Sequence, residues 1–178
     1  GMDAEFVFIV DSADPLRKVY PFLSNEYEQY IGCALATIPA PDENGNPGSD
    51  GRSYAEHFLK PFLSALEQID VRPRIIDNYT SYANGEFAEK SRIACERANE
   101  IREIIERVSS RELASDWFPY NPYGHNGSLD GVTVTGFEWP YVHWTQDGKP
   151  GKSDLNKADG KLPWRIDWPA KWGWIGVT

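Results

Sequence analysis

The stretch Ala4–Asp14, A-E-F-V-F-I-V-D-S-A-D, decides how this chain folds. It begins with a short, almost continuous apolar run, which is typical of a strand buried on both faces of a parallel sheet. Asp11, Ser12 and Asp14 follow at the carboxyl end of that strand, the edge at which open α/β sheets bind ligands. Two interpretations stay open for Asp11 and Asp14. They face a ligand or a magnesium-bound nucleotide, or they cap the turn and the helix behind it.

A helix and a second strand complete a βαβ unit. Ser53–Ile69 has apolar residues at helical spacing, and Ser53 and Glu56 match a capping box. Arg74–Asn78, R-I-I-D-N, has the composition of a strand, so we expect two parallel strands with a right-handed crossover. The polar, aromatic stretch Tyr79–Phe87 is then expected as a loop at the same sheet edge as the aspartates.

Other segments are predicted from local patterns. Asn25–Ile31 indicates a short helix that ends at Gly32, and Pro39–Gly51 has the composition of a loop. Phe87–Val108 carries the longest helical pattern, with one apolar stripe and favourable i,i+4 charge pairs on the other faces. Pro61 lies inside the Ser53–Ile69 pattern and predicts a kink or two helical segments there.

Short strands separated by Gly, Pro and Asn are predicted for residues 117–160. V-T-V-T at Val132–Thr135 and P-Y-V-H-W-T at Pro140–Thr145 favour antiparallel hairpins. This stretch contains no cysteine, and His125 and His143 alone cannot make a four-ligand zinc site. We therefore expect a small antiparallel β insertion without a metal.

Composition excludes several classes of protein. The 178 residues carry a net charge of −9, which argues against a chain that wraps nucleic acid along its whole length. Residues 149–171 carry six Lys or Arg against three Asp, so this stretch is either a modest phosphate-binding face or a solvated loop. No apolar run reaches the length of a membrane span, and no signal peptide is visible. Cys33 and Cys95 form no disulfide framework, so a reduced, cytoplasmic protein is expected.

The stretch Lys161–Trp174, K-L-P-W-R-I-D-W-P-A-K-W-G-W, has the highest density of aromatic residues. Three of its tryptophans are four residues apart and would form one stripe on a helix: Trp164, Trp168 and Trp172. Asp167 and Pro169 are plausible start signals for that helix. An aromatic face beside Arg165 and Asp167 suits a charged ligand with an apolar stem. The alternative is that the tryptophans are a hydrophobic anchor.

Three stretches, in this order along the chain, resemble the class I, archaeal-type lysyl-tRNA synthetases. They are D-S-A-D-P-L-R-K-V-Y-P-F-L at Asp11–Leu23, S-Y-A-E-H-F-L-K-P-F-L at Ser53–Leu63 and K-L-P-W-R-I-D-W-P-A-K-W at Lys161–Trp172. The resemblance covers nearly the whole chain and is weakest across Pro119–Gly160. It implies an α/β fold with a partial Rossmann-like parallel sheet in residues 1–116. A β-rich connective insertion would occupy 117–160, without the paired cysteines of many relatives, and 161–178 would return to the catalytic domain.

The resemblance also implies a function. Full-length relatives activate lysine with ATP and Mg²⁺ and transfer it to tRNA-Lys. Trp164 matches the tryptophan of the family implicated in lysine recognition, and its ring can cover the aliphatic stem or the ammonium of lysine. Further candidates for the lysine pocket are Arg165 and Asp167 as pocket-shaping partners, with Tyr79, Ser81 and Tyr82 on position alone. Asp11 and Asp14 would form the nucleotide or pocket edge, and no catalytic residue is assigned.

The two ATP-binding signatures of the family, a His-Ile-Gly-His-like turn and a Lys-Met-Ser-Lys-Ser-like loop, are absent from the sequence, as is any Gly-rich phosphate loop. We therefore expect a fragment that is inactive alone. An open strand edge at Phe6–Val10 and an uncovered tryptophan stripe predict self-association as a dimer. The competing hypothesis is a stand-alone, aromatic-rich ligand-binding module derived from a synthetase-like fold.

Overall fold

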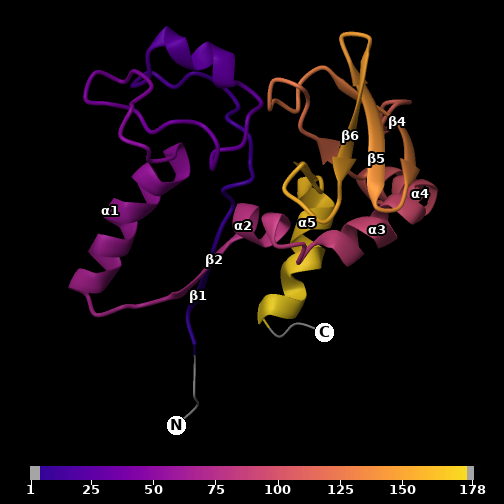
Figure 1. Cartoon of the computed structure of the whole chain (residues 1–178). Helices are drawn as coiled ribbons and strands as arrows, with labels where there is room; N and C mark the ends of the chain where they lie inside the picture. Colours follow the sequence, from indigo (N-terminus) through magenta and orange to yellow (C-terminus); the bar gives the residue numbers. More distant parts are fainter. Residues whose placement is uncertain (1–4, 176–178) are drawn as a thin grey trace. The chain divides into compact units, whose positions relative to one another are not determined.

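The computed structural model describes residues 5–175, with side chains up to Gly173. The chain divides into two compact units, Gly1–Tyr79 and Thr80–Thr178. The first contains one parallel strand pair and one long helix, and the second contains several short helices around small antiparallel sheets (Figure 1). The result is a mixed helix and strand fold, of which two strands are parallel.

The first unit is built on the predicted βαβ unit. Strand β1 (Val7–Val10) pairs in parallel with β2 (Arg74–Asp77), in a register that joins Val7 to Arg74 and Val10 to Asp77. Helix α1 (Tyr54–Gln68) lies between them in the sequence. The two predicted strands and their direction are therefore confirmed, whereas Ala4 lies outside the described residues. All four residues of β1 are half-buried rather than buried on both faces, because the described sheet has only two strands.

Helix α1 begins with the predicted capping box. The Glu56 amide donates to Ser53 Oγ at 3.2 Å, and the Ser53 amide donates to the Glu56 carboxylate at 2.7 Å. The hydrogen bond from the Ser53 amide lowers the pKa of Glu56, because it favours the charged carboxylate. Of the two outcomes predicted at Pro61, two separate helical segments are wrong, since α1 runs through Pro61 as a single helix, and a kink stays a prediction. Pro61 is exposed, so water can reach the helical carbonyl that the missing proline N–H leaves without a donor.

The core of the first unit surrounds Tyr27, in the segment between β1 and α1. Tyr27 belongs to η1 (Asn25–Tyr30), a 3-10 helix followed by Gly32 at φ +83°, so the predicted short helix is confirmed with tighter geometry. The apolar residues that form this core are Leu16, Leu23, Tyr27, Cys33, Ile38 and Tyr54. The Tyr27 hydroxyl donates to the Pro39 carbonyl at 2.8 Å, and burial raises the pKa of Tyr27 to about 12. Pro39–Gly51 forms the predicted loop, without a helix or an extended strand.

Helix α2 (Asn78–Ala83) follows β2 directly and contains the boundary between the two units. The prediction of a loop throughout Tyr79–Phe87 is therefore wrong for its first half. The residues of α2 are poor helix formers, so propensity gives no signal. Packing stabilises the helix near its carboxyl end: Tyr82 is buried, and its ring stacks on Phe87 with the centroids 4.0 Å apart.

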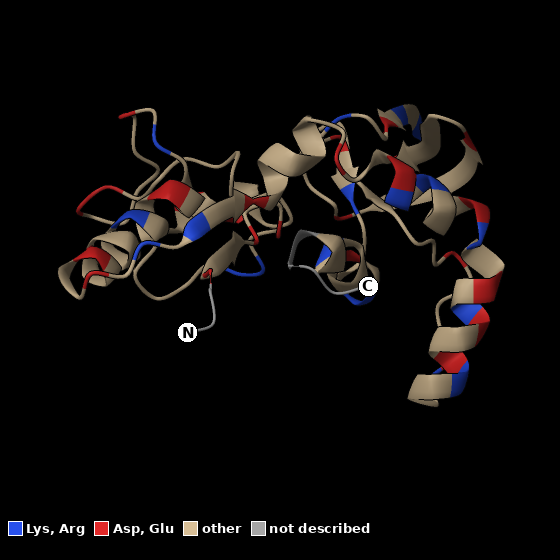
Figure 2. Ribbon diagram, turned by 90° about the horizontal axis from the view of Figure 1, so that it is seen from below, with Lys and Arg blue, Asp and Glu red and all other residues tan. Residues whose placement is uncertain are grey.

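The single helix predicted for Phe87–Val108 is wrong, because the structure contains two helices. Helix α3 (Ala88–Glu96) and helix α4 (Ala98–Ser109) meet at Arg97, which has φ −107° and ψ 26°. No Gly or Pro marks the break in the sequence. The break separates a packed helix from a solvated one: α3 buries four side chains and α4 buries none. Acidic and basic residues alternate along the length of α4 (Figure 2).

The predicted hairpins are confirmed as a three-stranded antiparallel sheet. Its strands are β4 (Val132–Glu138), β5 (Tyr141–Gln146) and β6 (Lys149–Asp154), hydrogen-bonded in that order. Asp147 and Gly148 link β5 to β6 with φ of 50° and 75°, as a type I′ turn requires. A smaller antiparallel pair joins β3 (Asn121–Pro122) to β7 (Gly160–Lys161).

The chain continues into α5 (Trp164–Lys171) and a 3-10 helix, η2 (Trp172–Ile175). Helix α5 begins at Trp164, after Pro163, so the predicted start at Asp167 is wrong. Pro163, with φ −57°, occupies the N-cap position without a side-chain cap. Among residues 5–175, no helix combines the length and apolar character needed to cross a membrane.

Candidate functional site

The acidic loop after β1 is tied to the end of β2 by one buried amide. Asn78, fully buried, accepts hydrogen bonds from the Ala13 amide at 2.9 Å and from Ser12 Oγ at 3.5 Å. Its Nδ2 donates to Asp11 Oδ1 at 3.1 Å. The Tyr79 amide donates to Ser12 Oγ at 3.2 Å. Polar groups from the carboxyl ends of both parallel strands therefore meet at one edge, as the βαβ topology requires.

Sequence analysis missed Asn78 as a site residue. It was assigned to the end of the second strand, although it is the first residue of α2. The signal that was available is its position, since Asn78 follows β2 as Asp11 follows β1. Because parallel strands end at the same edge of a sheet, the pairing of these two side chains could have been predicted.

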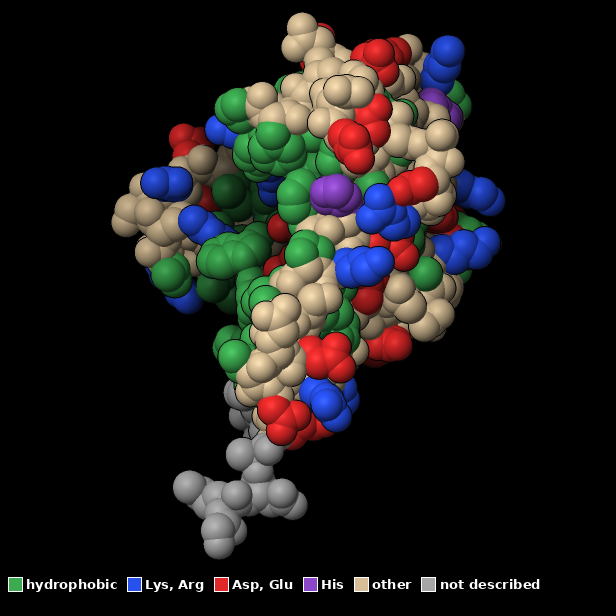
Figure 3. Space-filling model, turned by 90° about the vertical axis from the view of Figure 1, so that its left-hand side faces the viewer, with side chains coloured by type: hydrophobic (Ala, Val, Ile, Leu, Met, Phe, Trp, Pro, Cys, Tyr) green, Lys and Arg blue, Asp and Glu red, His purple; other side chains and the backbone are tan. Residues whose placement is uncertain are grey.

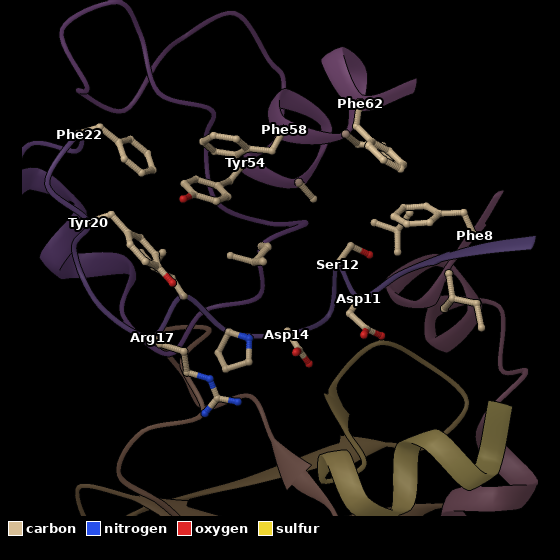
Figure 4. Close-up of a pocket in the computed structure, with 17 residues that line it drawn as sticks. Phe8, Asp11, Ser12, Asp14, Arg17, Tyr20, Phe22, Tyr54, Phe58 and Phe62 are labelled. Atoms are coloured by element: carbon tan, nitrogen blue, oxygen red, sulfur yellow. The ribbon is translucent and has the colours of Figure 1, made fainter. Parts of the chain in front are cut away.

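A cavity of about 590 Å³ opens beside this loop, entirely within the first unit (Figure 4). Its volume is within the range of small-molecule sites. Polar side chains reach it from the β1 end: Asp11, Ser12, Asp14 and Arg17. Aromatic side chains supply much of the rest of the lining as an aromatic wall: Phe8, Tyr20, Phe22, Tyr54, Phe58 and Phe62.

Four rings of this aromatic wall contact one another in a row, and the wall is in part exposed. Phe22 lies between Tyr20 and Phe58, with ring centroids 5.8 and 5.7 Å away, and Phe58 in turn contacts Tyr54 at 4.7 Å. Phe22 and Phe58 remain 53 % and 43 % exposed. On the side of the molecule where α1 lies, hydrophobic side chains gather in a band (Figure 3). The cavity thus has an apolar wall and an end that carries charges of both signs, an arrangement that suits an amphipathic ligand.

In the second unit, α5 exposes its tryptophans and buries two of its three charged side chains. Trp164, Trp168 and Trp172 are all exposed, and Trp164 is 63 % exposed. Asp167 and Lys171, one turn apart, are only 2 % and 1 % exposed and form an ion pair with each other. The Lys171 ammonium also lies 5.2 Å from the centre of the Trp168 ring. The predicted tryptophan stripe exists, but within the described structure it is not a buried anchor.

The buried ion pair is completed by Tyr82, which sequence analysis had placed only as a possible pocket residue. Tyr82 Oη donates to Asp167 Oδ1 at 2.8 Å and accepts a hydrogen bond from the Leu162 amide at 2.9 Å. Burial and the nearby Asp167 charge raise the pKa of Tyr82 well above its usual range, so the hydroxyl stays protonated and remains a donor. The acceptor oxygens of Asp167 are therefore engaged by Tyr82 and Lys171.

The predicted site residues fall into two sets. Asp11, Asp14 and Tyr79 belong to the first unit, where the first two line the cavity. The second set lies in the second unit: Ser81, Trp164, Arg165 and Asp167. Ser81 is buried in α2, whereas Arg165 is exposed on α5. Asp167 accepts a hydrogen bond from Tyr82 of α2.

Metal ligands do not cluster in the part of the chain that the structure describes. No group of three or more His, Cys, Asp or Glu side chains comes together there. Cys33 and Cys95 are both buried free thiols, and burial raises the pKa of Cys95 to about 12. A neutral, buried thiol is a poor metal ligand, so Cys95 is not a candidate ligand.

Comparison with known proteins identifies the family. The chain belongs to the class I tRNA synthetases of the lysine type: the family described as "tRNA synthetases class I (K)" matches residues 1–178. A lysine–tRNA ligase from Picrophilus torridus is 39 % identical over 180 residues, which are 100 % of this chain and 34 % of that protein. Lysine–tRNA ligases from Thermoplasma volcanium and Methanosarcina barkeri are 37 % and 39 % identical, and the matched regions are 34 % and 33 % of their lengths. The chain therefore spans about a third of the curated relatives it matches.

Proposed function

We propose that this chain is part of a lysine–tRNA ligase. In the proposed reaction the lysine carboxylate attacks the α-phosphate of ATP and pyrophosphate leaves. A hydroxyl of the terminal ribose of tRNA-Lys then attacks the carbonyl of the lysyl-adenylate, and AMP leaves. The observation that carries the proposal is the family match along all 178 residues, at 37–39 % identity to lysine–tRNA ligases. Mg²⁺ would accompany ATP as part of the substrate.

In this proposal β1 and β2 are two strands of a Rossmann-like parallel sheet that extends beyond this chain. Residues 1–116 would belong to the catalytic domain, 117–160 to a connective insertion, and 161–178 again to the catalytic domain. The hydrogen bonds between Asn78 and the Asp11–Ala13 turn support a ligand-binding edge at the ends of β1 and β2. Asp11 and Asp14 would form the nucleotide or pocket edge. The two buried thiols are consistent with a reducing cytoplasm.

The proposed lysine pocket uses the exposed face of α5. The Trp164 ring is free to cover the aliphatic stem or the ammonium of lysine, because its side chain is largely exposed. Arg165 would lie beside it, whereas Asp167 would shape the pocket from behind, since it is buried against Tyr82 and Lys171. Tyr79 and Ser81, at either side of the boundary between the units, are assigned to the pocket on position.

Lysine binding tests this assignment directly. Calorimetry with lysine is expected to show weak binding, and arginine is expected to bind less well. Trp164→Ala should abolish binding of lysine, while Trp172→Ala, which removes another exposed indole of the same stripe, should not. Trp174→Ala is likewise expected to leave lysine binding unchanged, although the side chain of Trp174 lies outside the described residues. Tight lysine binding that survives Trp164→Ala would contradict the assignment.

Catalysis is expected to need more than this chain. Stabilising the charge on the transferring nucleotide requires positioned donors to its phosphates, and the signature motifs that supply them in the family are not in this sequence. We therefore expect no lysine-dependent ATP–pyrophosphate exchange from the chain alone. Measurable exchange with the purified chain would contradict this part of the proposal.

The second candidate is a stand-alone binding module. The aromatic-walled cavity of the first unit favours it, because this cavity is complete within residues 8–62 and fits a small amphipathic ligand. A screen of nucleosides, amino acids and sugars by thermal shift distinguishes the two. A ligand unrelated to lysine or ATP that loses affinity in Phe58→Ala, but not in Trp164→Ala, would favour the module.

A further inference from the structure

One hydroxyl group connects three segments of the second unit. Tyr82 comes from α2, and its Oη contacts the Leu162 amide, just before α5, and the Asp167 carboxylate, inside α5. The ring itself cannot turn freely, because Tyr82 is 1 % exposed and stacks on Phe87. The entry of the chain into α5 and the inner face of α5 are therefore both attached to the same rigid side chain.

Other features that usually set the rotation of a helix are weak in α5. Its fully buried side chains are Asp167 and Lys171, and the apolar Ile166 and Ala170 beside them are only half-buried. Its N-cap residue, Pro163, makes no side-chain cap, and Pro169 removes an amide donor from the helix interior. Trp164 lies three residues before Asp167 and seven before Lys171, so it is on the same side of α5, yet it stays exposed while they are buried. Polar contacts therefore contribute to the choice of the buried face of α5.

We propose that Tyr82 is a positioning residue that sets the rotation of α5 and so directs Trp164 outward. The hydroxyl holds the Asp167 carboxylate at the correct face, Asp167 holds the Lys171 ammonium, and the helix turns with them. Trp164 lies three residues before Asp167, so the orientation of its ring depends on this attachment. The proposal rests on the proposed function in one respect: the positioned indole is the one assigned to lysine.

The test compares two buried tyrosines of the second unit. Tyr82→Phe removes the hydroxyl that contacts α5. Tyr120→Phe is the matched control, because Tyr120 is also 1 % exposed but its hydroxyl has no hydrogen-bond partner in the described structure. Hydrogen exchange is measured on the amides of α5 and, as an internal reference, on those of β5. The indole N–H resonance of Trp164, assigned with Trp164→Phe, reports on the surroundings of that ring.

Tyr82→Phe is expected to speed amide exchange in α5 by about tenfold or more, since a hydrogen bond to a charged group contributes about 1.5–3 kcal/mol. The Trp164 resonance should shift, and exchange in β5 should stay unchanged. Tyr120→Phe should leave both α5 readouts unchanged. Equal effects of the two substitutions, or an unmoved Trp164 resonance in Tyr82→Phe, would overturn the proposal.

A second variant separates the hydroxyl from the ion pair. Asp167→Asn with Lys171→Met removes both charges but keeps an oxygen that can accept from Tyr82. If Tyr82 sets the rotation, this double variant keeps a near-native Trp164 resonance, and that result decides the matter even if Tyr82→Phe does not fold. A Trp164 resonance that moves in the double variant and not in Tyr82→Phe would assign the rotation to the ion pair instead.

Lysine titration distinguishes this proposal from the proposed function. If Tyr82→Phe loosens α5 but lysine leaves the Trp164 resonance unmoved even in the native chain, the positioning role stands and the assignment of Trp164 to lysine fails. If lysine binds the native chain and Tyr82→Phe with equal affinity, the positioning role fails and the lysine assignment stands.

Discussion

The two units of this chain treat hydrophobic and charged side chains in opposite ways. In the first unit, aromatic side chains of α1 and of the preceding loop stay partly exposed around a cavity. In the second unit, α5 exposes its tryptophans and buries an Asp–Lys pair. Burying an ion pair is costly unless its members are well paired and hydrogen-bonded. Tyr82 provides that second partner for Asp167, whereas Phe22 and Phe58 of the aromatic wall remain exposed.

This difference shows that hydrophobicity alone does not determine which face of a helix is buried. Helix α1 follows its apolar pattern in part, since Leu59, Leu63 and Leu66 are half-buried whereas Phe58 and Phe62 are exposed. Helix α5 does not follow its apolar pattern, because the Asp167–Lys171 pair is buried and hydrogen-bonded to Tyr82 while Trp164 and Trp168 stay exposed. In both units the apolar surface that remains exposed is the surface we assign to ligands or to association.

The largest expected effect follows from breaking the buried ion pair. Asp167→Ala leaves Lys171 buried without its carboxylate and is expected to lower the free energy of unfolding by about 3–5 kcal/mol. Urea denaturation followed by circular dichroism measures the change. The matched control is Glu96→Ala, which breaks the exposed i,i+4 pair with Arg92 and should cost less than about 1 kcal/mol. Similar losses for the two variants would show that the buried pair contributes no more than a surface pair.

Association is expected to come mainly from the first unit. Its β1 has one hydrogen-bonded neighbour among residues 5–175, and its aromatic wall is exposed, so we expect a concentration-dependent dimer. Phe58→Lys should weaken dimerisation by about tenfold or more, since it places a charge in the apolar surface. Trp172→Lys, the corresponding change in the second unit, should weaken it less.

Light scattering at several concentrations measures this equilibrium. A larger effect from Trp172→Lys would show that the dimer interface includes the tryptophan stripe Trp164, Trp168 and Trp172. A strictly monomeric native chain at high concentration would contradict the expectation for both surfaces.

The smallest expected effect is a loss of folding stability at alkaline pH, and it comes from buried tyrosines. Tyr27 has its pKa raised to about 12, above the value near 10 expected in the unfolded chain. Because the folded state favours the neutral phenol, the stability from Tyr27 is complete below pH 10 and is lost as the pH rises from about 10 towards 12.

Urea midpoints between pH 9 and 11.5 test this dependence. Tyr27→Phe should flatten the alkaline decline, and Tyr120→Phe should flatten it too, because burial raises the pKa of Tyr120 well above its usual range. An unaltered decline in Tyr27→Phe would assign the pH dependence to other groups.

Several features were readable from local sequence. The alternation of strand, capped helix and strand predicted the β1–α1–β2 unit, because a buried run and a Ser–Glu capping box depend on neighbouring residues. The hairpins around Val132–Thr135 and Pro140–Thr145 were predicted for the same reason. The resemblance of three stretches to class I lysyl-tRNA synthetases predicted the family that the comparison confirms. For the site, the sequence located the acidic loop at the edge of the sheet and the tryptophan stripe at helical spacing.

Other features depend on contacts between residues far apart in the chain. The break at Arg97 carries no Gly or Pro and follows from α3 being packed and α4 solvated. Asn78 acquires its role only when the Asp11–Ala13 turn folds against it, 65 residues away for Ala13. The inward face of α5 is set by Tyr82, 85 residues before Asp167. The sequence by itself determined the local elements and the family, because short-range periodicity and capping encode them. Tertiary structure alone decided which side chains meet, because a buried polar group is stable only where a distant partner completes its hydrogen bonds.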